Sequence, residues 1–159
     1  MKTEIRTLPD QKVIFVTSRG LVDNTFNQAA KRSFDILCAW IDRKGLWPKV
    51  GPCLGICPDD PGIDPGGCRY MGGFIVKEGV DVQPEGEVEM TTLPGGRWAV
   101  ARYIGPYEGL TQAWSTIYRE WLPSSGEQLR DTPPYEVYVK DKATTPPAEL
   151  VTEICIALK

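Results

Sequence analysis

The feature that most constrains this chain is an internal repeat, in which segments of its second half follow segments of its first half at a nearly constant separation. LPDQKV at residues 8–13 lies 85 positions before LPGGRW at residues 93–98, and Gly20 and Gly105 keep the same separation. Further matches at 81 or 82 positions join Trp40 to Trp121, Gly45 to Gly126, residues 52–56 to 134–138 and residues 69–76 to 151–158. The chain is therefore expected to fold as two similar halves.

Each half shows the same order of secondary structure. Apolar runs rich in β-branched and aromatic residues predict the opening strands, at residues 13–16 and 98–101. Apolar residues at helical spacing then predict a helix in each half, and a glycine that follows it is typical of a helix C-terminus. The remaining predictions are helices at residues 26–41 and 110–121, followed by strands at 52–56, 69–76, 134–138 and 151–158.

The order β-α-β-β thus occurs twice and predicts an α+β fold with antiparallel sheets. We expect repeats at residues 3–77 and 87–159, joined by a polar linker at residues 78–86. One β-α-β-β unit is too small to bury its sheet face well, whereas two units that share a core also remove exposed strand edges. The centre of such a pseudo-twofold pair is an expected place for a ligand cleft.

Composition excludes several classes of function. The chain contains no histidine, which rules out a Ser-His-Asp triad and a Cys-His pair, so proton transfer would depend on other groups. A net charge of −3 and the lack of clustered Lys and Arg argue against direct nucleic-acid binding. Neither a membrane-spanning run nor a signal peptide is recognisable, so a cytoplasmic location without a membrane partner is expected.

The five cysteines are interpreted as buried, reduced thiols, because their number is odd and none forms a C-x-x-C pair. A zinc site formed by Cys53, Cys57 and Cys68 is an alternative, but the spacing fits no common zinc motif. We therefore expect no metal and no cofactor.

Several motifs resemble those of the GyrI-like family of effector-binding proteins and together cover nearly the whole chain. The matching segments are LPGGRWAV at residues 93–100, GPY at 105–107, WLPSSG at 121–126, YEVY at 135–138, TEICIAL at 152–158, and, in the first half, Asp59-Asp60-Pro61 and Cys68-Arg69-Tyr70. The chain departs from the family pattern at Trp98 and Cys155, where tyrosine is more usual.

The resemblance implies a duplicated β-α-β-β fold of the SHS2 type that binds lipophilic, planar or cationic drugs and toxins. No DNA-binding motif fits before residue 4, so the chain resembles the stand-alone members of the family. An internal pseudo-dimer has little need to dimerise, and a monomer or weak dimer is expected.

Glu136 is the first candidate binding residue, because family members place a functional glutamate on the matching strand. Alternation along the strand predicts that Val137 and Val139 face the helices, and that Glu136 lies on the opposite face near Tyr138 and Cys155. Leu54 is expected at the equivalent position of the first half. A carboxylate among aromatic rings could pair with a ligand cation. The further candidate ligand-binding residues are Trp40, Tyr70, Trp98, Tyr103, Tyr107, Tyr138 and Cys155.

Two other functions stay open at this point. The first is hydrolysis of a cyclopropane-bearing genotoxin, with Glu136 as acid or base and the hydroxyl of Tyr103 or Tyr138 holding the oxygen of the substrate. The second is a protein-interaction role of the gyrase-inhibitor type, for which the acidic pair Asp59-Asp60 is the available feature. Trp114 and Trp121 lie at helical spacing and are expected in the core.

Overall fold

The computed structural model describes residues 1–60 and 62–159, which form two compact units. The N-terminal unit is Asp10–Pro94, and the C-terminal unit combines Met1–Pro9 with Gly95–Lys159. Pro61, the last residue of the Asp59-Asp60-Pro61 motif, lies outside the described residues. No helix in residues 1–60 or 62–159 is both long and apolar enough to cross a membrane.

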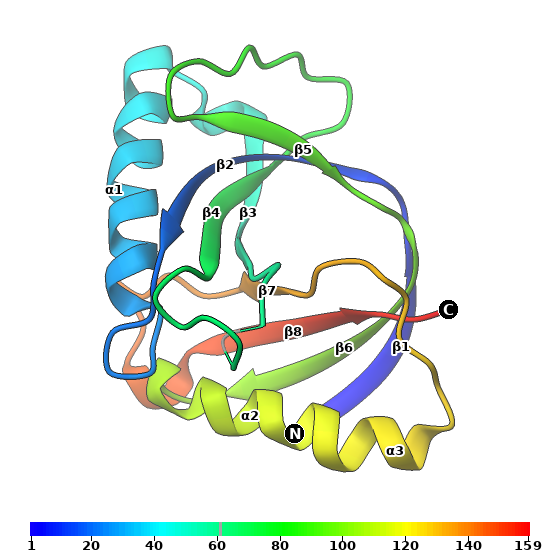
Figure 1. Ribbon diagram of the computed structural model, residues 1–159. Helices are drawn as coiled ribbons and strands as arrows, with labels where there is room; N and C mark the ends of the chain where they lie inside the picture. The colour runs from blue at the N-terminus through cyan, green and yellow to red at the C-terminus, as the bar shows by residue number, and fades with distance from the viewer. Residues whose placement is uncertain (61) are drawn as a thin grey trace. The chain divides into compact units, whose positions relative to one another are not determined.

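The N-terminal unit is an antiparallel sheet in the order β3-β4-β2-β5, with one helix packed on β2 and β4 (Figure 1). Its elements are β2 (Gln11–Arg19), α1 (Asn27–Lys44), the 3-10 turn η1 (Trp47–Lys49), β3 (Val50–Ile56), β4 (Arg69–Val76) and β5 (Glu89–Leu93).

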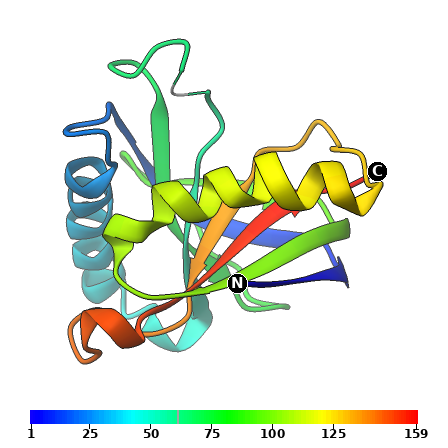
Figure 2. The same cartoon turned by 90° about the horizontal axis from the view of Figure 1, so that it is seen from below.

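The C-terminal unit has the same plan, with the strand order β1-β6-β8-β7 and a helical segment across one face of the sheet (Figure 2). Its elements are β1 (Lys2–Leu8), β6 (Gly96–Ile104), η2 (Tyr107–Gly109), α2 (Leu110–Thr116), η3 (Ile117–Trp121), α3 (Leu122–Ser125), β7 (Tyr135–Tyr138), η4 (Pro147–Glu149) and β8 (Val151–Ala157).

The predicted α+β class and the twofold β-α-β-β order are confirmed, as β2-α1-β3-β4 and as β6-α2-β7-β8 with η3 and α3 extending the helix. Gly45 and Gly126 also end their helices in the left-handed conformation, with φ of 64° and 75°.

The strands β1 and β5 were not expected, and each pairs with the other half of the repeat. β1 precedes β2 in the sequence but pairs with β6, whereas β5 precedes β6 but pairs with β2. The registers are reciprocal: Leu8 lies opposite Gly96, and Leu93, its repeat equivalent, lies opposite Gln11. The compact units therefore follow different boundaries from the sequence repeats, because the two halves exchange their first strands.

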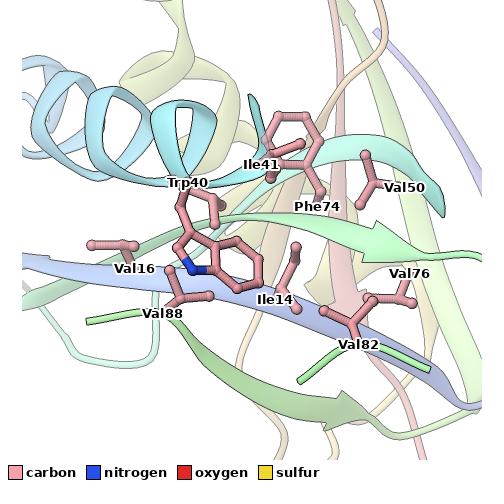
Figure 3. Close-up of a cluster of buried hydrophobic side chains, with 10 residues drawn as sticks. Ile14, Val16, Trp40, Ile41, Val50, Phe74, Val76, Val82 and Val88 are labelled. Carbon is pink, nitrogen blue, oxygen red and sulfur yellow. The ribbon is translucent and has the colours of Figure 1, made fainter. Parts of the chain in front are cut away.

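The core of the N-terminal unit lies between α1 and its sheet. Trp40 and Ile41 contribute from the helix, and Phe74 contributes from β4 (Figure 3). The connector after β4 closes the cluster with Val82 and Val88. All of these side chains are at least nine-tenths buried, so the hydrophobic effect supplies most of the stability of this unit.

The helix of the C-terminal unit contains a π-helical turn at η3. The Leu122 N–H donates to the carbonyl of Ile117, five residues back, and Pro123 follows with no N–H to donate. A proline ring clashes with the carbonyl four residues earlier, and a wider turn relieves that clash.

The π turn also explains why the repeat separation changes along the helices. Ala113 and Ile117 are buried like Ser33 and Leu37, at a separation of 80, whereas Gly126 follows Gly45 at 81. A π turn accommodates one extra residue without shifting the buried face before it.

Close packing of the backbone makes Gly73 of β4 intolerant of a side chain. A Cβ atom added to Gly73 would lie 2.4 Å from the Ile14 carbonyl oxygen, and a backbone atom in a central strand pair cannot easily move. We expect Gly73→Ala to destabilise the protein by about 2 kcal/mol, as overpacking typically does. Urea unfolding measures the loss. Gly51→Ala is the control, since its added Cβ would meet only an ordinary contact at 3.6 Å, and equal midpoints for the two variants would contradict the expectation.

Candidate functional site

The strand register places Glu136 on the helix face of the C-terminal sheet. Glu136 of β7 lies opposite Ile154 of β8, and Ile154 packs in the cluster formed with Ala113 and Ile117 of the helical segment. Residues directly opposite each other in an antiparallel pair share a face. The prediction that Glu136 faces away from the helices is therefore wrong: Val137, opposite Glu153, occupies that other face.

Both carboxylate oxygens of Glu136 accept hydrogen bonds from aromatic side chains. The Trp114 indole N–H donates to Oε1 at 2.5 Å, and the Tyr138 hydroxyl donates to Oε2 at 2.8 Å. Glu136 is only 7% exposed, and burial raises its pKa above the ordinary range while the two donors partly oppose that shift. The site thus favours a protonated or charge-compensated carboxyl group.

Within residues 1–60 and 62–159, no Lys or Arg side chain is paired with this carboxyl group. None of the ion pairs found there includes Glu136, and its carboxylate instead accepts hydrogen bonds from the neutral donors Trp114 and Tyr138. A buried carboxylate without a counter-ion is costly, and proteins rarely retain one without a functional reason.

The two donors and the rings that they contact are here called the aromatic cluster: Tyr107, Trp114, Tyr118 and Tyr138. The ring centroids of Tyr107 and Tyr138 lie 5.7 Å apart in an edge-on arrangement, and Trp114 stacks on Tyr118 at 6.0 Å. Tyr118 is 36% exposed, so the cluster extends from Glu136 to the surface. Sequence reasoning missed Tyr118 and assigned Trp114 to the core. The sequence pattern that could have indicated both residues is their spacing, since residues at positions i and i+4 lie on the same side of a helix.

Tyr103 lies on the same face, but its hydroxyl is engaged in a turn. The Tyr103 Oη atom donates to the Pro106 carbonyl at 2.7 Å. A Cβ atom on Gly109 would lie 2.0 Å from that Oη atom, so Tyr103 fills the space left by the glycine. Next to it in the sheet, the fully buried Thr152 Oγ1 atom has no hydrogen-bond partner among the described residues.

Trp98 and Cys155 lie on the opposite face of the sheet from Glu136. Cys155 lies opposite Tyr135, and the Tyr135 ring packs edge-on against Trp98 at 5.0 Å between centroids. Burial raises the pKa of the Cys155 thiol to about 12, so this thiol stays protonated. The expectation that Glu136 lies near Tyr138 holds, but the expectation that it shares a face with Cys155 is wrong.

The other two candidates belong to the N-terminal unit. Tyr70 is buried and its ring packs near Phe26 at 5.5 Å, while the Trp40 indole N–H donates to Glu85 at 3.0 Å. Trp40 is also part of the hydrophobic core.

The position equivalent to Glu136 is Gly55 rather than Leu54. Gly55 lies opposite Gly72, just as Glu136 lies opposite Ile154, which follows Gly72 by 82 residues. The sequence alignment was therefore shifted by one residue at this strand, and a shift of one residue moves a side chain to the other face. Leu54 is a fully buried core residue.

No group of three or more His, Cys, Asp or Glu side chains within residues 1–60 and 62–159 is arranged to hold a metal ion. The three thiols considered for zinc, at Cys53, Cys57 and Cys68, form no disulfide with one another.

Comparison of the sequence with known proteins identifies a family, and comparison of the fold identifies similar structures. The family model for the GyrI-like small molecule binding domain matches residues 1–159. The chain is 29% identical to the SPbeta prophage-derived protein YosT of Bacillus subtilis, over 87% of this chain and 89% of YosT. It is 26% identical to the DNA gyrase inhibitor of Escherichia coli, over 74% and 75%. A structure of SAV2435 bound to tetraphenylphosphonium has a similar fold, with a TM-score of 0.62 at 15% identity, covering 100% of this chain and 94% of that one.

Burial of Glu136 predicts a pH-dependent contribution to stability. Because its pKa is raised in the folded state, its contribution is fully present below the ordinary value of 4.5 and is lost as the pH rises through the folded-state pKa. We expect the free energy of unfolding of the wild type, minus that of Glu136→Gln, to fall over this interval.

Urea unfolding of both proteins at a series of pH values tests this, since other titrating groups cancel in the difference. Replacement of Ile154, which lies opposite Glu136 and has no titratable group, by Val serves as the control and should give a nearly flat difference. A difference that rises with pH for Glu136→Gln would contradict the assignment.

Proposed function

Since the chain belongs to the GyrI-like family of small-molecule-binding domains, we propose that it binds lipophilic organic cations at Glu136 and the aromatic cluster. The observation that carries the proposal is that Glu136 is buried, accepts hydrogen bonds from neutral donors, and forms no ion pair with a Lys or Arg of the described residues. A ligand cation would supply the missing positive charge.

The aromatic cluster suits such a ligand. Ring faces attract cations through their quadrupoles, and the attraction strengthens when water is excluded. Tyr107, Trp114, Tyr118 and Tyr138 also offer apolar surface to a planar or bulky organic group, while the Trp114 and Tyr138 donors hold the carboxylate in place. The relative SAV2435, which binds tetraphenylphosphonium, supports the choice of ligand class.

Tetraphenylphosphonium tests the proposal, with triphenylphosphine oxide as a neutral molecule of similar shape. We expect saturable binding of the cation to the wild type by isothermal titration calorimetry, and at least a tenfold loss for Glu136→Gln, because a buried charge pair contributes more than about 1.4 kcal/mol. The neutral compound should bind both proteins alike. Equal cation affinity in the two proteins would refute the role of Glu136.

Removal of the Trp114 donor should shift the pH dependence of binding. Cation binding requires the ionised carboxylate, so affinity should rise as the pH passes the pKa of Glu136. In Trp114→Phe one oxygen loses its donor, the pKa rises further, and we expect the midpoint to move up by about one pH unit.

The matched control is Trp121→Phe, on the same helical segment, where Trp121 packs against the hydrophobic cluster. An equal shift in both variants would show that the effect is structural rather than due to the lost hydrogen bond.

Hydrolysis of a cyclopropane-bearing genotoxin is a second candidate, favoured by the raised pKa of Glu136. A protonated Glu136 would donate its proton to the enolate that forms when water attacks the ring carbon and the ring bond breaks. The proton lost by the attacking water would then return to the Glu136 carboxylate. Tyr138 suits the supporting role better than Tyr103, whose hydroxyl is bonded to Pro106. Incubation with a duocarmycin-type compound, followed by mass spectrometry, would reveal a ring-opened product that is absent with Glu136→Gln. Tight binding without product would exclude this candidate.

A gyrase-inhibitor-type interaction has less support from the loop after β3. Asp59 pairs with Arg69, which lowers the pKa of Asp59 to about 2, and Asp60 accepts a hydrogen bond from the backbone of Gly62. These acidic groups are occupied in shaping the loop.

A further inference from the structure

The N-terminal unit contains a groove beside α1, distinct from Glu136 and the aromatic cluster. It has a volume of about 610 Å³ and lies where β2 ends and α1 begins. Its lining residues are Thr17, Ser18, Arg19, Gly20, Val22, Gln28, Ala29 and Arg32.

The repeat explains why this groove exists. Ser18 is the equivalent of Tyr103, because Ser18 lies opposite Tyr70 and Tyr103 lies opposite Thr152, at constant separations. In the C-terminal unit the Tyr103 side chain fills the equivalent space between the strand and the start of the helix, and it reaches Gly109. In the N-terminal unit the small Ser18 leaves this space open, and the large Tyr70 turns toward Phe26 and Phe34 instead.

The groove carries positive charge. Arg19 and Arg32 are its only charged lining residues among those the structure describes. Arg32 is held in place: its Nη1 atom donates to the Thr17 carbonyl and to Ser18 Oγ, both at 3.1 Å. Ser18 is 4% exposed and its hydroxyl also bonds to the fully buried Ser33 hydroxyl at 2.7 Å. A buried hydroxyl pair thus orients a guanidinium at the groove wall, which is a preorganised arrangement.

A carboxylate already occupies one side of this guanidinium. Glu87 accepts from Arg32 Nη2 at 2.6 Å, and both side chains are about half exposed. Exposed pairs of this kind are weak, so an incoming anion can displace Glu87. The first turn of α1 adds a favourable field, since it contains no acidic residue and its N-cap residue makes no side-chain hydrogen bond.

We propose that this groove is a second ligand site, specific for small organic oxyanions, with Arg32 as the anchor and Arg19 and Ser18 as supporting groups. The volume admits an organic body as well as the anionic group. Guanidinium groups bind carboxylates and phosphates through charge-assisted hydrogen bonds, so both kinds of oxyanion fit. The protein would then bind an anion in one unit independently of a cation in the other.

Calorimetric titration with phenyl phosphate and with benzoate tests this inference and shows which oxyanion is preferred, with benzyl alcohol as the neutral control. We expect saturable binding of at least one anion to the wild type and a loss of at least tenfold in Arg32→Gln, because a charge-assisted bond is removed. Glu87→Gln should bind a few-fold more tightly, since it frees Arg32 from its competitor. Glu136→Gln should leave anion binding unchanged, so this test succeeds or fails independently of the proposed cation site.

A double variant tests whether anion binding needs the open space beside Ser18. Ser18→Tyr with Ala29→Gly reproduces in the N-terminal unit the Tyr103 and Gly109 pair of the C-terminal unit, and should abolish anion binding by filling the groove. Ala29→Gly alone should retain it. Absence of saturable binding in the wild type, or equal affinity in the wild type and Arg32→Gln, would overturn the proposal, whether or not the double variant folds.

Discussion

The burial of the Glu136 carboxyl group is the constraint that links the helix of the C-terminal unit to its sheet. Glu136 sits on a sheet face otherwise packed with Ile154, Ala113 and Ile117, where an uncompensated charge is expensive. The helix must therefore place a hydrogen-bond donor within reach of the carboxylate, and the Trp114 indole N–H is that donor. Tyr138, two residues along the same strand, supplies the other donor. The identities of a helix residue and a strand residue are thus linked through one carboxyl group.

The helix can place this donor correctly because its π turn comes after Trp114 in the sequence. Trp114 belongs to α2, before the π turn at Ile117–Trp121. The π turn accommodates the extra residue between Trp114 and Gly126. Trp114 and the buried residues Ala113 and Ile117 therefore keep the same positions relative to the sheet as their equivalents in the first repeat. Pro123 supplies the local reason for the wide turn, and it does so where the register of Trp114 is already fixed.

Most of the fold could be predicted from the sequence, because the repeat and the spacing of apolar residues reflect which side chains are buried in the core. The prediction of which face Glu136 occupies was wrong, because it depends on the register of one strand to within one residue. Glu136 and Tyr138 alternate with Val137 and Val139, and valine is more often the buried member of such a pair. Here the glutamate is buried, because Trp114 and Tyr138 satisfy it, and these contacts join residues 22 and 2 positions apart. The strands β1 and β5 escaped prediction for a related reason. As partly exposed strands they carry mostly polar residues, and only long-range pairing with β6 and β2 makes them strands.

Duplication gives two copies of a scaffold, and the differences between the copies lie at matched positions. Where the C-terminal unit has Glu136, the N-terminal unit has Gly55, and where the former has Tyr103, the latter has Ser18. The two copies exchange their first strands: β1 pairs with β6 of the second repeat, and β5 pairs with β2 of the first repeat, in equivalent registers. The differences between the copies lie on the sheet face near the helices, and they leave the strand pairing unchanged. Tyr103 fills in the C-terminal unit the space that Ser18 leaves open in the N-terminal unit, so this exchange of a large for a small side chain accounts for the groove.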